Sequence, residues 1–127
     1  MRGRLDFFRD VEDVRVVVGY QANEVIKEAL KFRSDVIFIY NHSYFETKTG
    51  ASFYLGSRHA NDLVIEYDGD LLVHPDDVRL CLETKGEYIA YSEKWSDDAV
   101  FVLVNGQGQV SGLSTELVNL NAPGVRH

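Results

Sequence analysis

The sequence predicts an α/β fold, because two apolar runs typical of buried strands flank a segment with helical periodicity. Residues 14–18 and 36–40 are rich in β-branched and aromatic side chains, and residues 21–33 between them carry apolar side chains at helical spacing. Strand, helix and strand in this order form the crossover unit of parallel sheets. We therefore expect a mixed, mostly parallel sheet with helices on both faces.

The next part of the chain continues this alternation. Residues 51–55 predict a short helix, and residues 63–67 are a third apolar run that we expect to form the third strand. Pro75 favours the first position of a helix that we expect to run to residue 84.

The pattern changes after residue 86, where strand signals follow one another without a helix between them. The predicted strands are residues 87–92, 99–104 and 109–113. The turn residues at 105–108 predict that the last two strands form an antiparallel hairpin. We expect residues 113–127 to be a loose tail.

Length and charge limit the classes of function. The 127 residues fit one domain, residues 1–127, and no apolar run approaches the roughly 20 residues that cross a bilayer. The net charge of −7 opposes binding to DNA, RNA or anionic membranes. We therefore expect a cytoplasmic protein with no nucleic-acid or membrane partner.

The acidic turn at Asp68, Gly69 and Asp70 follows the third predicted strand directly. Paired carboxylates around a glycine can face one hard cation, so we predict that Asp68 and Asp70 hold Mg²⁺ or Mn²⁺. Glu66 lies on the same side of the strand by alternation, although it can equally be a surface residue. The alternative is that Asp-Gly serves only the turn.

A polar loop follows the strand predicted at residues 36–40 and lies at the same end of the sheet. Its candidate substrate-binding residues are Asn41, Thr47, Lys48, Thr49 and Ser52. A loop of this kind before a helix can bind an anion through backbone amides. It can also be a helix cap, with Thr49 or Gly50 in that role.

Taken in order, these segments resemble the nucleotidylyltransferases that act on sugar phosphates and choline phosphate. The matching positions are residues 16–20, Asn41, Tyr44, residues 47–49, Ser52, Leu55, residues 68–72 and residues 99–114. The resemblance implies a Rossmann-like fold that joins a nucleoside triphosphate to a phosphorylated small molecule. It also implies that Asp70 holds the catalytic divalent ion, whereas Lys48 stands where the family usually has asparagine.

Both ends of the family's pattern are missing. No glycine-rich loop with a Pro-Lys element matches near residues 1–4, and the later segment with a further metal-binding aspartate has no match. Because nucleotidyl transfer needs several groups at once, we expect a truncated Rossmann-like nucleotidyltransferase fold that binds a divalent ion and a nucleotide or phosphorylated small molecule. We expect no complete catalytic cycle and assign no catalytic residue.

Two alternatives remain open: a non-catalytic oligomerisation or protein-interaction module, and a transferase completed by a partner chain. The resemblance implies that the family's first strand is missing between the strands at 14–18 and 63–67. Two strand edges would then be unpaired, and self-association would cover them. We therefore expect a homo-oligomer.

Overall fold

A computed structural model describes residues 8–70, 72–91 and 100–115 of the chain. The chain divides into two compact units, Met1–Glu87 and Tyr88–His127. The units are described separately below. One domain over residues 1–127 stays a prediction.

The first unit is built on a parallel strand pair joined by a helix. The elements are β1 (Arg15–Val18), α2 (Ala22–Leu30) and β2 (Ile37–Tyr40). β1 pairs with β2 in parallel, with Arg15 opposite Ile37 and Val18 opposite Tyr40. The predicted crossover unit is therefore confirmed.

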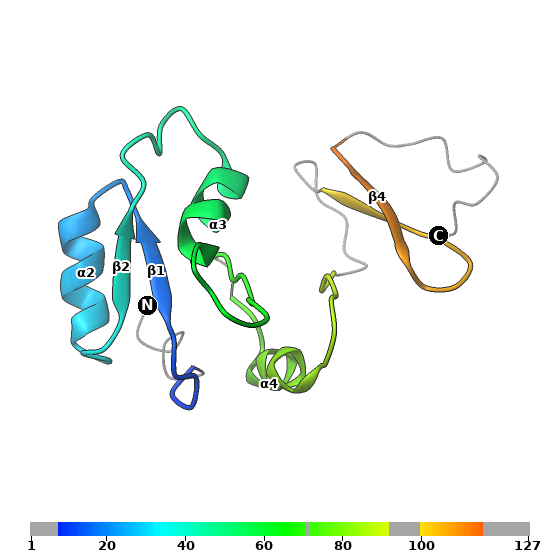
Figure 1. Ribbon diagram of the computed structural model, residues 1–127, viewed down its shortest axis with the longest axis horizontal. Coiled ribbons are helices and arrows are strands. Elements are labelled where there is room, and N and C mark those ends of the chain that lie inside the picture. The colour runs from blue at the N-terminus through cyan, green and yellow to red at the C-terminus, as the bar shows by residue number, and fades with distance from the viewer. Residues whose placement is uncertain (1–7, 71, 92–99, 116–127) are drawn as a thin grey trace. The chain divides into compact units, whose positions relative to one another are not determined.

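The helices α2 and α3 (Thr49–Ser57) lie on opposite sides of this strand pair (Figure 1). Arg15 donates from Nη1 to the carbonyl oxygens of Gly56 and Arg58, at 3.0 and 2.6 Å. A Cβ on Gly56 would lie 3.0 Å from Cγ2 of Val17, so the missing side chain lets α3 approach β1 closely. Alternation along the strand turns Val18 towards the other face, and Val18 is buried. Helices on both faces of the strand pair are thus confirmed.

The third predicted strand does not form, which corrects the expected sheet. Residues 63–67 belong to no strand, and Leu63, Val64 and Ile65 remain exposed. Among the described residues the parallel sheet has two strands, β1 and β2, so the larger mixed sheet is wrong. An apolar run is not sufficient, because a strand also needs a neighbour that accepts its backbone hydrogen bonds.

The helix α4 (Pro75–Glu83) begins at the predicted proline. The imidazole Nδ1 of His74 accepts a hydrogen bond from the backbone N–H of Asp76 at 3.2 Å, which caps the helix. Val78 is its buried residue. His74 thus has a structural role at the start of α4.

The second unit contains an antiparallel hairpin, as predicted. It consists of β3 (Phe101–Val104) and β4 (Val110–Ser114), which form a separate two-stranded sheet. In the turn, Oδ1 of Asn105 accepts hydrogen bonds from the N–H groups of Gln107 and Gln109, both at 2.9 Å.

The neighbours of the hairpin differ from the predicted pattern. Residues 87–91 form no strand, which corrects the prediction there, and residues 92 and 99 lie outside the described residues. Leu113 and Ser114 belong to β4, while residues 116–127 of the predicted tail lie outside the described part.

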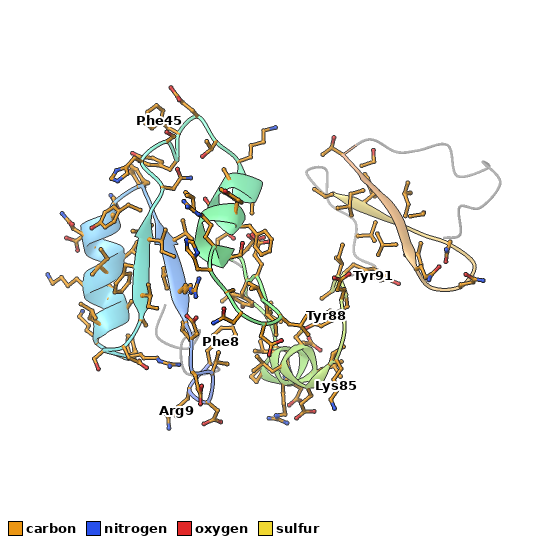
Figure 2. The ribbon with its side chains drawn as sticks, in the orientation of Figure 1. Phe8, Arg9, Phe45, Lys85, Tyr88 and Tyr91 are labelled. Carbon is orange, nitrogen blue, oxygen red and sulfur yellow. The ribbon has the colours of Figure 1, made fainter. Side chains whose placement is uncertain are left out.

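The buried core is small and lies mainly around β1, α2 and β2. Its apolar members in the described residues are Val18, Ala29, Val36 and Val78. Many larger apolar side chains lie exposed around it, as the drawn side chains show in Figure 2. No helix in the described ranges is long and apolar enough to cross a membrane.

Candidate functional site

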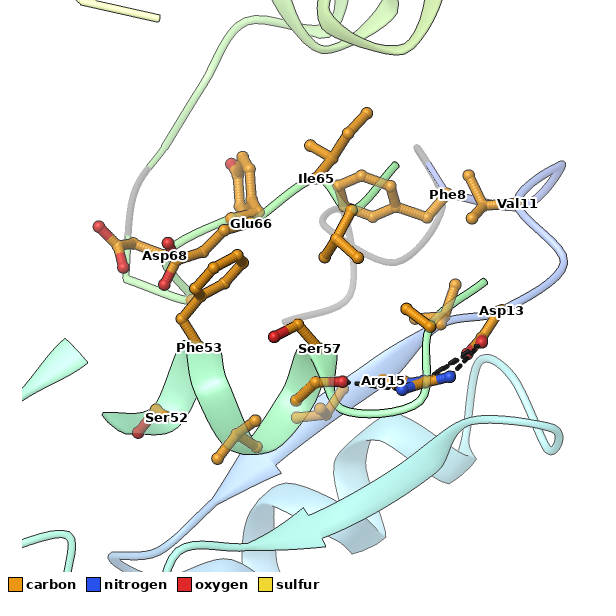
Figure 3. Close-up of a pocket in the computed structure, with 18 of the residues that line it drawn as sticks. Phe8, Val11, Asp13, Arg15, Ser52, Phe53, Ser57, Ile65, Glu66 and Asp68 are labelled. Atoms are coloured by element: carbon orange, nitrogen blue, oxygen red, sulfur yellow. Dashed lines mark hydrogen bonds and ion pairs between the residues drawn. The ribbon is translucent and has the colours of Figure 1, made fainter. Parts of the chain in front are cut away.

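The first unit contains a cavity of about 940 Å³ beside β1 (Figure 3). Four parts of the chain line it: the stretch through β1, the helix α3 with the loop before it, residues 59–69, and Leu82 of α4. Glu66, Asp68 and the side chains of Thr47, Lys48, Thr49 and Ser52 contribute polar groups. The expected strand at residues 63–67 therefore forms one wall of this cavity.

The two ends of the cavity differ in chemistry. In Figure 3, Ile65 lies near Phe8 and Val11, whereas Glu66 and Asp68 lie beside Phe53 in the N-terminal half of α3. The ring of Phe8 also packs edge-on against Tyr67, with 5.6 Å between the ring centroids. The end near Phe8 and Val11 therefore combines apolar side chains with the charged Asp13 and Arg15, and the end near Phe53, called the acidic end, carries Glu66 and Asp68.

Glu66 and Asp68 form a pair of like charges at the acidic end. Partial burial raises the pKa of the Glu66 carboxyl above its ordinary value of 4.5, and the negative charge of Asp68 raises it further. The two carboxylates therefore share one side of the segment, as alternation predicts. No described Lys, Arg or His forms an ion pair with either of them.

Asp70 is exposed and is not among the residues that line the cavity, whereas Asp68 is. In the described ranges, no three side chains of His, Cys, Asp or Glu converge as a complete protein metal site would need. Mg²⁺ is often held by only one or two carboxylates, with phosphate and water oxygens as its other ligands. The assignment of Asp68 and Asp70 to a metal stays a prediction, and Glu66 joins it as a candidate.

The polar loop after β2 is brought together around Asn41, which is only 5% exposed. The amide Nδ2 of Asn41 donates to Oγ1 of Thr47 at 2.9 Å and to Oγ of Ser52 at 3.2 Å. Its Oδ1 accepts from the N–H of Ser43 at 3.0 Å. Asn41 thus ties the loop to α3, and its buried polar atoms are already satisfied.

Lys48 is the N-cap residue of α3, and its side chain makes no capping hydrogen bond. The alternative with Thr49 or Gly50 as the cap is therefore wrong, because both lie inside the helix. No acidic residue occupies the first turn of α3. The ammonium of Lys48 and the positive end of the α3 dipole favour an anion at this end of the cavity.

The close approach of the loop to β1 depends on Gly19. A Cβ at Gly19 would lie 2.6 Å from Cβ of Tyr44, which is too short for any side chain there. The glycine at the end of β1 therefore lets Tyr44 reach the cavity wall. Sequence reasoning did not single out Gly19 for this role, or Phe8 and Val11 for the apolar end.

No protein-family model, curated protein or solved structure matches this chain. The resemblance to nucleotidylyltransferases therefore stays a prediction from short motifs.

Proposed function

We propose that the first unit binds a phosphate-bearing small molecule, such as a nucleotide, together with Mg²⁺ or Mn²⁺. The site is the acidic end of the cavity. The observation that supports this proposal is that Glu66 and Asp68 line the cavity together, where burial and, as the smaller cause, the charge of Asp68 raise the pKa of Glu66. A divalent cation between these carboxylates would replace the repulsion by attraction.

The anion of the ligand would lie towards the start of α3. Lys48, Thr49 and Ser52 line the cavity there. A phosphate bound by Lys48 and the first-turn amides would supply oxygen ligands to the cation held by Glu66 and Asp68. Both charges are needed because the chain carries a net charge of −7 and would otherwise repel an anion.

Binding without complete nucleotidyl transfer fits the groups at this site. Transfer at phosphorus depends on several positioned cations and donors acting together. The described cavity offers one lysine and two carboxylates at its acidic end, and Asn41 and Thr47 are engaged in the loop network. We therefore assign ligand binding to this site and no catalytic residue.

Titration calorimetry with MgATP and MgCTP tests the proposal. Asp68→Asn and Glu66→Gln should each weaken binding about tenfold or more, a loss of about 1.4 kcal/mol. Asp10→Asn is the matched control, because Asp10 is exposed and does not line the cavity. Removal of Mg²⁺ with EDTA should weaken binding to the wild type and leave Asp68→Asn almost unchanged.

Asp70→Asn in the same experiment decides which carboxylates act together. A loss equal to that of Asp68→Asn would place the cation between Asp68 and Asp70, and no loss would place it between Glu66 and Asp68. The absence of nucleotide binding by the wild-type chain would contradict the proposal.

A further inference from the structure

The outer side of β1 carries backbone groups that no described residue pairs. Val14 and Val18 accept hydrogen bonds from Ile37 and Asn41 of the β2 region, at 3.0 and 2.8 Å. In a parallel ladder alternate residues face the partner strand, so the N–H and C=O groups of Arg15 and Val17 point away from β2. Their main chains form no hydrogen bond with any other described residue.

The opposite wall of the cavity, residues 63–66, also carries backbone groups that no described residue pairs. Residues 63–66 have no assigned secondary structure, and the N–H of Leu63 bonds only to the neighbouring side chain of Asp62, at 2.7 Å. The main chains of Val64, Ile65 and Glu66 form no hydrogen bond within the described ranges. Two backbone segments therefore line one cavity without pairing with each other.

The size of the cavity matches one additional strand. A residue in a packed sheet occupies about 4.8 Å across, about 10 Å between layers and about 3.3 Å along the strand, or roughly 160 Å³. A cavity of about 940 Å³ therefore has room for an additional strand of several residues. β1 has four residues, and such a strand would span its full length.

The charges of the cavity indicate what kind of strand would enter it. The carboxylates that line it are Glu12, Asp13, Asp62, Glu66 and Asp68, and the cationic side chains are Arg15 and Lys48. Arg15 is already paired with Asp13 at 2.7 Å. A strand with basic ends complements this lining, whereas a second copy of a chain with net charge −7 would be repelled.

We propose that the cavity binds one extended segment of a partner protein, β-branched in its centre and basic at its ends, which adds a strand to the outer side of β1. The N–H and C=O groups of Arg15 and Val17 provide the hydrogen bonds, as in other cases of strand addition. This interaction goes beyond the proposed nucleotide site, because it depends on the backbone of β1 and not on Lys48.

The decisive variant is Val17→Pro, which removes an N–H that β2 does not use. The matched control is Val17→Thr, which keeps this N–H and a β-branched side chain. The probe is a seven-residue peptide of alternating Thr and Val with Lys at both ends, measured by fluorescence anisotropy. Val17→Pro should weaken its binding at least tenfold, Val17→Thr should stay within about twofold, and a peptide with Glu at both ends should bind at least tenfold more weakly.

Amide hydrogen exchange of the wild-type chain provides a test that does not depend on the folding of the proline variant. Without peptide, the N–H groups of Val16 and Val18 should be protected by β2, and those of Arg15 and Val17 should exchange freely. The peptide should protect Arg15 and Val17. Protection of these two amides in the free monomer would show that the chain fills the cavity itself and would overturn the proposal.

Two further outcomes also overturn it. Light scattering that shows a dimer with Arg15 and Val17 protected would assign the cavity to a second copy, in line with the homo-oligomer expected from the sequence. Equal binding of the Lys-ended and Glu-ended peptides would show that the cavity does not select a segment by its charge. Because a nucleotide would occupy the same cavity, the nucleotide proposal is tested separately, without peptide, by Asp68→Asn and the response to Mg²⁺.

Discussion

Residues 36–40 and 63–67 are two apolar runs of similar length, but only the first contains a strand. The first contains β2, which pairs with β1 along its whole length. The second lines the cavity wall and belongs to no strand among the described residues. The difference is not in local sequence, because both runs combine β-branched and aromatic side chains.

The connection before each run explains the difference. α2 packs against β1 and returns the chain beside it, so that residue 37 meets the carbonyl of Val14. α3 also packs against β1, but the chain after it continues across a cavity about as large as one strand. Strand pairing is thus decided by the position in which the crossover leaves the chain.

The largest expected effect is on the free energy of unfolding, when an aspartate replaces one valine in each run. Val36 is 8% exposed and Val64 is 42% exposed. Val36→Asp would bury an unpaired charge and should cost about 3 kcal/mol or more, whereas Val64→Asp should cost less than about 1 kcal/mol. Urea denaturation followed by circular dichroism measures both. Equal losses would show that residues 63–67 are packed as a strand and would contradict the comparison.

The sequence predicted the elements whose signals are local. The crossover of β1, α2 and β2, the proline at the start of α4 and the turn at Asn105 all follow from residues close together in the chain. The local sequence could not show whether residues 63–67 and residues 87–91 form strands, because strand formation there depends on a distant neighbour. β-propensity describes how well a run fits a sheet and does not supply the partner.

An intermediate effect is expected where β2 ends and the loop begins. Asn41→Ala would leave the hydroxyls of Thr47 and Ser52 and the N–H of Ser43 without their partner. The expected loss in the free energy of unfolding is about 1–3 kcal/mol, and the hydroxyls of Thr47 and Ser52 should then form hydrogen bonds with water. Asn61→Ala is the control, because Asn61 is exposed and should change stability by less than about 0.5 kcal/mol. A cost below 0.5 kcal/mol for Asn41→Ala would show that the buried network does not order the loop.

The candidate site was predictable in part for the same physical reasons. The location of Asn41, Thr47, Lys48, Thr49 and Ser52 beyond the end of β2 follows from strand direction, which the sequence indicates. Asp68 lines the cavity although the run before it forms no strand, so strand direction does not account for its position. The separate role of each of these residues could not be predicted from the sequence. Asn41 is used for structure because it is buried with partners, and Glu66 joins Asp68 because alternation and partial burial bring their charges together.

The smallest effect is a dependence of stability on pH that originates in Glu66. The pKa of Glu66 is raised in the folded chain above its ordinary value of 4.5, so the folded state binds this proton more tightly than the unfolded state. The contribution to stability is therefore present below pH 4.5 and is lost as the pH rises through the folded pKa. Glu66→Gln should remove this loss and raise stability at pH 7 by about 0.5 kcal/mol or less, because solvent screens a partly exposed group.

Urea denaturation between pH 4 and pH 8 measures this slope, with Glu83→Gln at the exposed end of α4 as the control. Asp68→Asn should reduce the slope without removing it, because burial is the larger cause of the shift and the charge of Asp68 the smaller. If a cation occupies the acidic end of the cavity, Mg²⁺ with a nucleotide should abolish the slope in the wild type, since a bound cation favours the ionised carboxylates. A slope unchanged by the ligand would place the cation away from Glu66 and would leave Asp68 and Asp70 as the pair to test next.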